Sequence, residues 1–384
     1  MMIAQAVLKA KDIYGLVVDT LQKHLSLKTE GWKCRTEQSL ALLVKAVATG
    51  SSLEATCQDS CGVVSSNRLR EQLNTALDVS DLRSQEIEMN QALATAIPSE
   101  MPRGGLEVAI DTHDEAFYGK GAELLSYTCR SQAKDGTSHF FRIATAYVIW
   151  REVRLTLALV YVLPEDDLAA VVERLLHRLA RLGLHDMVLY LDKGFCNGAV
   201  IQRLQAQQQA AVLACPIRGK KGGIQAHCHG RKSKTLTYTF TDGTTVNLVL
   251  VASCRPQKGG KKKRKWLAFV LVKLNWTPKL VYKKYRRRFG IECSYRILRQ
   301  AKAFTNSRNP ALRFFLLGLS LLIQNLWVLV RWLCTRRPSK GRYPLISTLL
   351  RFELFCKFLV RAVERYYPPP DSIAVFALPD FVIH

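Results

Sequence analysis

Hydrophobic residues recur at helical spacing through residues 1–100 of the chain. One helical face is formed by Leu40, Leu43, Val44 and Val47. Gly50 would end this helix, and two shorter helices are predicted next, from about Leu53 to Asp59 and from Ser65 or Ser66 to Leu77. This spacing is typical of a helix-turn-helix that contacts DNA. A helical bundle that only packs or dimerises shows the same pattern, so both interpretations stay open.

From residue 106 the pattern changes to short apolar runs that predict β-strands. Three of them, Leu106 to Ile110, Leu124 to Thr128 and Phe140 to Trp150, are expected to be neighbouring antiparallel strands. Alternating elements follow, namely helix 166–182, strand 187–191, helix 199–209 and strand 211–215. Hairpin strands followed by alternating helices and strands predict an α/β fold, with helices packed on a mixed sheet.

Residues 216–278 combine Gly-rich basic loops with alternating strands, which predicts a β-rich insertion. Strands 235–241 and 244–252 would be joined by Asp242-Gly243, a pair that favours tight hairpin turns. Helical spacing returns over 279–299 and 310–334. We therefore divide the chain into an all-α N-terminal domain (1–100), the first part of an α/β domain (101–215), the insertion (216–278), the second part of the α/β domain (279–335) and a C-terminal tail (336–384).

The apolar run from Phe314 to Val330 approaches the length of a membrane-spanning helix. Ser320, Gln324 and Asn325 interrupt the run, and Arg residues bracket it. We therefore expect a helix buried in the protein core.

Charge points to a polyanionic partner. The 56 Lys and Arg residues outnumber the 31 Asp and Glu residues, which leaves a formal net charge of +25. The excess is localised, because residues 212–340 contain about 29 Lys and Arg and only two acids, Asp242 and Glu292. A positive field of this kind favours nucleic acid as the partner, with an anionic membrane surface second.

The 11 Cys residues are scattered along the chain without the dense spacing of a disulfide framework. Reduced thiols in a cytoplasm fit this pattern best. Cys57 with Cys61, and the run His227-Cys228-His229, lack a second ligand pair at zinc spacing, so a structural zinc site is disfavoured.

Three acidic residues are candidates for metal-dependent chemistry. Asp111 and Asp192 each follow an apolar run directly, so both would emerge at strand ends and converge if the strands are neighbours. Glu292 lies in a basic helical stretch, where an ion pair with Arg288 or Arg296 is the alternative to metal ligation. Close carboxylates repel one another, and a divalent cation, Mg²⁺ or Mn²⁺, is the usual way to keep several of them ionised.

The helix around Glu292 carries a recognisable motif. Tyr285, Arg288, Glu292 and Arg299 resemble the Y-x2-R-x3-E-x6-K signature of insertion-sequence DDE transposases, with Arg in place of the final Lys. Asp192-Lys193-Gly194-Phe195 resembles the second-Asp motif of this group, and Ile110-Asp111-Thr112 resembles the first. The similarity covers roughly residues 105–335. Arg at the last position keeps the charge and can grip phosphate with two hydrogen bonds, and Lys302 is a reserve candidate.

The resemblance implies an RNase H-like catalytic domain, with a β-rich insertion before the helix that carries Glu292. It implies two metal ions, held by Asp111, Asp192 and Glu292, that activate water or a DNA 3′-OH and stabilise the leaving oxygen. Tyr285 and Arg288 would contact phosphate, with Arg299 beside the cut end. The implied partners are double-stranded DNA, namely terminal inverted repeats and target, and a second copy of the chain on DNA. A membrane is not implied, and the setting would be the nucleoid of a prokaryotic cytoplasm.

A basic run at residues 258–265 is a candidate phosphate-binding surface. Its main cations are Lys261, Lys262, Lys263, Arg264 and Lys265. A solvated charged loop is the alternative. Trp266 or Trp276 could stack on an unpaired base of the cut end, although either could instead belong to the core. Lys193, next to Asp192, is a further DNA-binding candidate.

Two other classes of function remain open. One is a non-catalytic DNA-binding protein derived from a transposase, against which the presence of all three carboxylates argues. The other is a metal-dependent nuclease with an RNase H-like fold. The Tyr-Arg-Glu-Arg helix and the basic insertion favour transposition over simple hydrolysis.

Overall fold

The computed structural model describes residues 7–27, 34–134, 136–256, 262–336, 346 and 348–372. The N-terminal helices are α1 (Ala10–His24), α2 (Thr36–Thr49), α3 (Leu53–Gln58), α4 (Ser66–Ala76) and α5 (Leu82–Ala94), with the 3-10 turn η1 (Val79–Asp81) before α5. The strands are β1 (Glu107–Ala116), β2 (Cys129–Lys134), β3 (Thr137–Trp150), β4 (Val153–Val162), β5 (Val188–Leu191), β6 (Ala211–Cys215), β7 (Lys234–Thr239), β8 (Thr245–Pro256) and β9 (Lys262–Val272). The remaining helices are α6 (Ala122–Leu125), α7 (Leu168–Arg181), α8 (Gly198–Ala206), α9 (Pro278–Tyr285), α10 (Phe289–Leu298), α11 (Pro310–Cys334) and α12 (Phe352–Glu364), with 3-10 turns η2 (Lys193–Phe195), η3 (Ile224–His227) and η4 (Arg286–Arg288).

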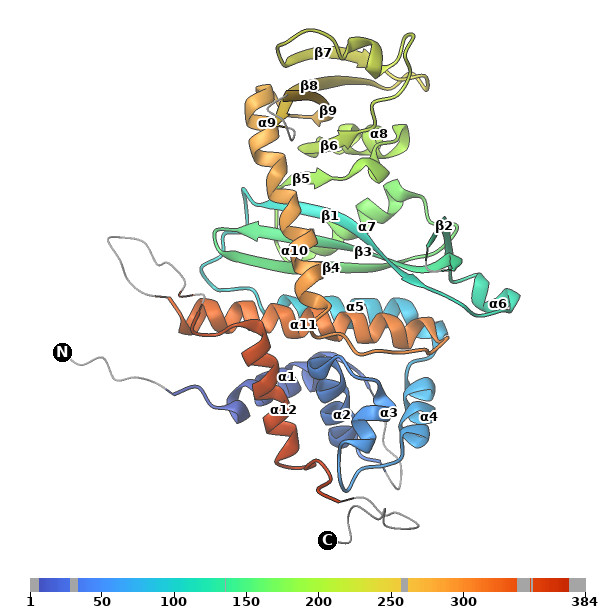
Figure 1. Cartoon of the computed structure of the whole chain (residues 1–384), viewed down its shortest axis with the longest axis vertical. Coiled ribbons are helices and arrows are strands. Elements are labelled where there is room, and N and C mark those ends of the chain that lie inside the picture. Colours follow the sequence, from blue (N-terminus) through green and yellow to red (C-terminus); the bar gives the residue numbers. More distant parts are fainter. Residues whose placement is uncertain are drawn as a thin grey trace, which may run out of the picture.

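The strands form one mixed sheet, with helices packed against it (Figure 1). Its order is β2-β3-β1-β5-β6-β9-β8-β7, and β4 also pairs with β3. The neighbours β1, β5 and β6 run parallel to one another, whereas the other pairs are antiparallel. The mixed α/β fold predicted from the sequence is therefore confirmed. Strands β7, β8 and β9 of the predicted insertion continue the same sheet, because β9 pairs with β6.

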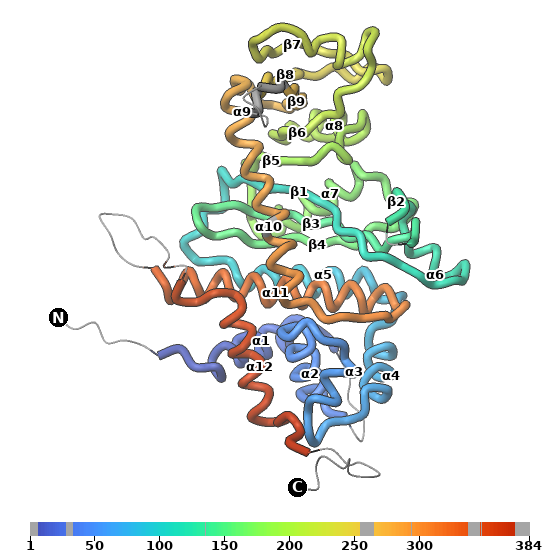
Figure 2. The backbone as a smooth tube through the Cα atoms, in the orientation of Figure 1, coloured from blue at the N-terminus to red at the C-terminus, as the bar shows by residue number. Residues whose placement is uncertain are grey.

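The two faces of the sheet are covered by different helices, because alternate residues of each strand point to opposite sides. Val108 and Ile110 of β1 belong to the large core cluster that also contains the apolar residues of α7 and α8. Ala109, between them, belongs to a cluster under α10. Helices α9 and α10 follow one another as a nearly straight rod across the strands, which the tube in Figure 2 makes visible.

A layer of helices lies beside the β4 edge of the sheet (Figure 1). Helices α5 and α11 contact β4, and α12 packs against α1 and α2. The predicted N-terminal helices are confirmed: Gly50 ends α2 with a φ of 68°, and the Ser52 and Ser65 side chains accept backbone hydrogen bonds at the starts of α3 and α4. These serines satisfy N–H groups that have no partner within the helix.

Helix α11 is the apolar run whose length would also suit a membrane. Within the part of the chain that the structure describes, it is the one helix that is long and apolar enough to cross a bilayer, and 89% of its most apolar window is buried inside the protein. Asn325 hydrogen-bonds to both backbone groups of Thr156 on β4, so its polar atoms are satisfied inside the core. Burial and this pairing agree with the expected core helix.

One expectation about the strands was wrong. Residues 124–128 do not form a strand, because α6 ends at Leu125 and a turn leads to β2. The third antiparallel strand is instead β4, which is buried on both faces between α5, α7 and α11 and therefore lacks clear alternation. The segment assigned as the C-terminal tail contains helix α12, which buries Phe355, Leu359 and Val363 against the N-terminal helices.

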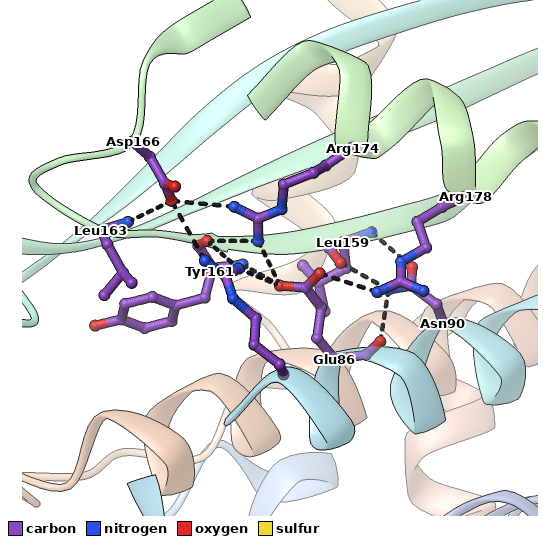
Figure 3. A network of polar contacts seen from close by, with 9 residues as sticks. Glu86, Asn90, Leu159, Tyr161, Leu163, Asp166, Arg174 and Arg178 are labelled. Carbon is purple, nitrogen blue, oxygen red and sulfur yellow. Dashed lines mark hydrogen bonds and ion pairs between the residues drawn. The ribbon is translucent and has the colours of Figure 1, made fainter. Parts of the chain in front are cut away.

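A buried acid joins the helical layer to the sheet (Figure 3). Glu86 of α5 is 1% exposed and pairs with Arg174 at 2.8 Å, Arg83 at 3.1 Å and Arg178 at 3.3 Å. It also accepts a hydrogen bond from the backbone N–H of Tyr161 on β4. Arg174 and Arg178 belong to α7, so one carboxylate connects three elements.

Replacing Glu86 by Ala is expected to lower the free energy of unfolding by about 3 kcal/mol, because it removes the buried carboxylate that pairs with three partly exposed arginines and with the backbone N–H of Tyr161. Urea unfolding of the full chain followed by circular dichroism measures the effect. Glu88→Ala, on the same helix, is the control and should cost less than about 1 kcal/mol. Equal destabilisation by the two variants would show that the network does not hold the layers together.

Candidate active site

Asp111 and Asp192 lie side by side at the point where two parallel strands stop pairing. The register of β1 and β5 pairs Ile110 with Leu191, and the two aspartates are the next residues of their strands. Because Ile110 faces the α7–α8 side, Asp111 faces the opposite side, under α10. Asp111 is not at a strand end as predicted, because β1 stays paired with β3 as far as Ala116.

The α9–α10 rod brings Glu292 to the same face of the sheet. Ile291 packs on Ala109 and Tyr147 of the central strands, which fixes the first turn of α10 over β1. Tyr295, one turn later, shares a 2.5 Å hydrogen bond with Thr145, the residue paired with Asp111 across β3. The backbone of Glu292 thus belongs to a helix that is held directly above Asp111. Its side chain remains half exposed.

Arg288 joins two of the three acids. Its Nη1 lies 3.4 Å from Asp111 Oδ2, and its Nη2 lies 2.8 Å from Glu292 Oε1. The Arg288 side chain is only 10% exposed, so this charge is held inside the site. The ion pair between Glu292 and Arg288 that the sequence offered as an alternative to metal ligation is present. Because this pair lies against Asp111, Glu292 also remains a candidate metal ligand.

Burial raises the pKa of Asp111 to about 6. Arg288 opposes this shift, whereas the nearby negative charges of Asp192 and Glu292 reinforce it. Asp192 in turn accepts a 2.8 Å hydrogen bond from the backbone N–H of Gly194, which orients its carboxylate at the start of η2. The site is a group of mutually repelling acids with one internal cation.

The donor atoms suit a divalent cation, but their arrangement does not enclose one. Carboxylate oxygens are the ligands that Mg²⁺ prefers. Among the residues that the structure describes, no three His, Cys, Asp or Glu side chains stand close enough together to hold a metal ion. Two of the acids are bridged by the Arg288 guanidinium instead. The chemistry of the donors fits a metal, whereas their present placement does not.

A cleft of about 780 Å³ opens beside Asp192, between β6, β9 and the α9–α10 rod. Its cations are Lys193, Lys265, Arg286 and Arg288. Its aromatic rings include Trp266, Tyr282 and Phe289, of which Phe289 is 48% exposed. A positively charged groove with aromatic side chains is the combination with which proteins bind single-stranded nucleic acid. Of the two candidate tryptophans, Trp266 lines this cleft and Trp276 packs against the core under α9.

Tyr285 differs from the expectation that it contacts phosphate. Its side chain is buried, and its hydroxyl donates a 2.9 Å hydrogen bond to the backbone carbonyl of Leu191. The ring packs against Tyr190 and Phe269. Because Leu191 directly precedes Asp192, Tyr285 anchors the rod to the end of β5 and so positions the second aspartate.

The other predicted DNA contacts divide into exposed side chains and side chains that are already paired within the protein. Arg299 ends α10 and is exposed, as a phosphate contact requires. Lys302, the reserve candidate, is occupied by an ion pair with Glu115 at 2.5 Å. Lys261 lies outside the described residues, and so do the side chains of Lys262, Lys263 and Arg264. Lys265 is exposed at the mouth of the cleft.

Some residues of the cleft were missed by the sequence reasoning. Arg286 was visible as part of a run of three arginines, although nothing distinguished it from its neighbours. Arg287 turns away to Glu107, whereas Arg286 faces the cleft. No sequence feature marked Tyr282 and Phe289 as cleft residues, because helical spacing alone does not predict which aromatic rings remain exposed.

Glu115 is a second buried acid on β1, and its partners are cations. Burial opposes its ionisation, but the neighbouring His113 and Lys302 lower its pKa to about 2. Arg313 lies 3.5 Å from the other carboxylate oxygen. His113 lies 3.6 Å away, beyond hydrogen-bond length, so Lys302 at 2.5 Å is the stronger contact. Because Lys302 follows α10 and Arg313 begins α11, this cluster fixes the segment between the two helices to β1.

Replacing Glu115 by Gln is expected to lower the free energy of unfolding at pH 7 by about 2 kcal/mol, less than the full shift implies. Its folded-state pKa lies below the ordinary 4.5. The stabilisation is therefore complete above that value and is lost as the pH falls toward 2. Urea unfolding at pH 7 and pH 3 should show a smaller pH dependence in the variant than in the wild type. Glu123→Gln, an exposed acid on α6, is the control, and an equal loss in both variants would contradict the prediction.

Comparison with known proteins supports the architecture. No protein-family model matches the chain. No curated protein sequence matches it either. Among solved structures, the chain resembles a piggyBac transposase determined by cryo-electron microscopy in a synaptic complex with hairpin DNA. The TM-score is 0.58 at 10% sequence identity, and the match covers 94% of this chain and 81% of that one. At this identity the likeness concerns the fold, and the chain has a mixed α/β fold like that of a transposase.

Proposed function

We propose that this chain is a DDE transposase, which cuts DNA at transposon ends and joins those ends to a target. The observation that carries the proposal is the register of β1 and β5, which sets Asp111 and Asp192 side by side. Glu292 approaches them from α10, where Arg288 links it to Asp111. Three acids from separate segments on one face of a sheet are what the sequence motif requires.

The strand order supports an RNase H-like catalytic domain. In this proposal β1 is the central strand. On one side it pairs with the antiparallel strand β3, which in turn pairs antiparallel with β4, and on the other side β5 and β6 run parallel to it. The basic strands β7, β8 and β9 form the insertion that precedes the helix of Glu292. The solved structure with a similar fold is itself a transposase bound to hairpin DNA, which makes this activity the first to test.

Divalent metal, Mg²⁺ or Mn²⁺, is part of the proposal. Asp111, Asp192 and Glu292 would hold two ions, whose chemistry is to activate the attacking water or 3′-OH and to stabilise the leaving oxygen. Tyr285 would contribute by keeping Asp192 in place through its hydrogen bond to Leu191. Burial of Asp111 would keep bulk water away from the reacting phosphate.

The cleft would hold the DNA end beside these acids. Lys193, Lys265 and Arg286 would bind backbone phosphates without reading the sequence. The Trp266 ring would stack on an unpaired base at the cut end. Arg299, exposed at the end of α10, would contact the same strand. We further propose that two copies of the chain bind together on the terminal inverted repeats.

The experiment is a cleavage and joining assay with the full chain. DNA carrying the inverted repeats that flank the gene is incubated with Mg²⁺ and a target plasmid, and the products are mapped on sequencing gels. We expect cuts at the repeat ends followed by joining to the plasmid, both abolished by a chelator. A DNA with scrambled repeats is the control. Cleavage without joining would replace the proposal by a nuclease, and binding without cleavage by a non-catalytic DNA-binding protein.

A further inference from the structure

The position of Arg288 is unusual for a residue expected to contact DNA. A phosphate-binding cation is normally exposed, but this guanidinium is buried among acids of its own chain. It spans Asp111 and Glu292, which belong to different elements and are the two acids that a metal would have to share. Its Nε is buried without a hydrogen-bond partner among the described residues. The group is therefore not fully satisfied where it lies.

Arg288 also lies at the boundary between the acids and the cleft. It lines the cleft together with Lys193 and Arg286. Its guanidinium is 5.6 Å from the Phe289 ring and 5.8 Å from the Tyr285 ring, so aromatic faces border its path toward the cleft. The side chain has two sets of potential partners, carboxylates on one side and any phosphate in the cleft on the other.

A guanidinium and a divalent cation compete for the same carboxylates, because the negative charge attracts both of them and the two cations repel each other. We propose that Arg288 is an internal counter-ion that blocks metal binding in the DNA-free protein and moves to a phosphate when DNA enters the cleft. The inference rests on the proposed function. It explains why the donors fit a metal while their arrangement does not. Arg288 is a positioning residue in this scheme, because it acts on the acids and not on the reacting atoms.

The exchange couples two binding events. If DNA removes Arg288 from the acids, DNA must raise the affinity for metal, and metal must raise the affinity for DNA by the same factor. An opposite charge within about 4–6 Å shifts the proton affinity of a carboxylate by about 1–3 pKa units. Loss of the Arg288 charge should therefore raise the affinity of the acids for another cation by about tenfold or more.

The test measures Mn²⁺ binding to the full chain without DNA, by following the electron paramagnetic resonance signal of free Mn²⁺. Arg288→Gln should bind Mn²⁺ about tenfold more tightly than the wild type. Arg288→Lys keeps the charge but cannot span both acids, so its affinity should lie between the two. Arg287→Gln is the matched control, because it removes the neighbouring charge, which pairs with Glu107 instead. This control should bind Mn²⁺ like the wild type.

Equal or weaker Mn²⁺ binding by Arg288→Gln would overturn the exchange. A rise of the same size in Arg287→Gln would also overturn it, because any nearby charge would then suffice. If Arg288→Gln does not fold, the wild type supplies the decisive measurement. A short DNA duplex should then increase its Mn²⁺ affinity, after correction for Mn²⁺ bound by the DNA alone, and an unchanged affinity would exclude the exchange.

A different set of results would contradict the proposed function. If neither the wild type nor Arg288→Gln binds Mn²⁺, or if Asp111→Asn leaves the Mn²⁺ titration unchanged, the acids are not a metal site. If binding depends on Asp111 but not on Arg288, the metal site stands and only the exchange is lost.

Discussion

Replacing Asp111 by Asn is expected to reduce DNA strand cleavage by at least about 1,000-fold while DNA binding is retained. A metal-binding carboxylate contributes several kcal/mol to stabilising charge in the transition state, and each 1.36 kcal/mol is about a factor of ten in rate. The fold should tolerate the change, because burial already disfavours the charged form of Asp111. Cleavage of end-labelled repeat DNA and gel-shift binding, measured on the same preparation, separate the two effects.

Asp192→Asn and Glu292→Gln should behave in the same way, since each removes one of the three acids. Asp114→Asn is the matched control. Asp114 lies three residues further along β1 and pairs with Arg142 at 2.7 Å, away from the other acids. Near-normal cleavage by any of the three variants would remove that residue from the site. A loss in Asp114→Asn as large as in Asp111→Asn would mean that strand β1, and not the acid, is what the reaction needs.

Neutralising Lys193, Lys265 and Arg286 together by Gln should weaken DNA binding on the order of 100-fold near 0.1 M salt. Each phosphate that is no longer neutralised lowers the slope of log affinity against log salt concentration by about 0.9, so three phosphates lower it by up to about 2.7. The three cations line the cleft beside Asp192. Fluorescence anisotropy with labelled duplex DNA over a range of salt concentrations measures the slope.

The control replaces Lys120, Arg130 and Lys134 by Gln, three exposed cations near β2 at the other end of the sheet. Their loss changes the net charge equally but should leave the slope nearly unchanged. Preference for the terminal repeats should survive in both variants, because phosphate contacts position a protein while base edges specify the site. Equal slopes in the two variants would show that DNA responds only to the overall charge and not to the cleft.

The basic run predicted from the sequence can be tested in the same way. Neutralising Lys261, Lys262, Lys263, Arg264 and Lys265 together should lower the slope by up to about 0.9 for each phosphate that these side chains bind. An unchanged slope would mean that the run is a solvated loop away from DNA. Loss of repeat preference with an unaltered slope would instead assign base recognition to the insertion and not to the N-terminal helices.

The local elements of this protein followed from its sequence because short-range physics decides them. Helix α11 was predicted with its observed bounds, since a proline start and a long apolar run need no distant partner to be recognised. The Asp242-Gly243 turn was also predicted, because a hydrogen bond within two residues and a positive φ at Gly243 determine it. The expectation for Leu124 to Thr128 failed because a run of five residues, only three of them apolar, is short enough to fit a helix as well as a strand.

The three candidate acids could be named from the sequence, because each stands out against its neighbours, two after apolar runs and one in a basic segment. Whether the three acids lie close together in space could not be predicted from the sequence. It depends on the register of β1 against β5 and on the packing of Ile291 beneath α10, which are contacts between segments far apart in the chain. The contacts of Arg288 could be predicted only in part. Helical spacing predicted a possible ion pair with Glu292, but the contact with Asp111 depends on the tertiary structure.

The sequence by itself therefore determined which residue types were present and which local elements carried them, because propensity, capping and charge act within a few residues. Only the tertiary structure decided that Tyr285 is an anchor and not an exposed contact, that Lys302 belongs to Glu115, and that a cleft opens beside Asp192. The physical reason is burial. The helix that covers a strand, and the charge that meets a buried acid, are set by packing across the whole sheet, which no local pattern encodes.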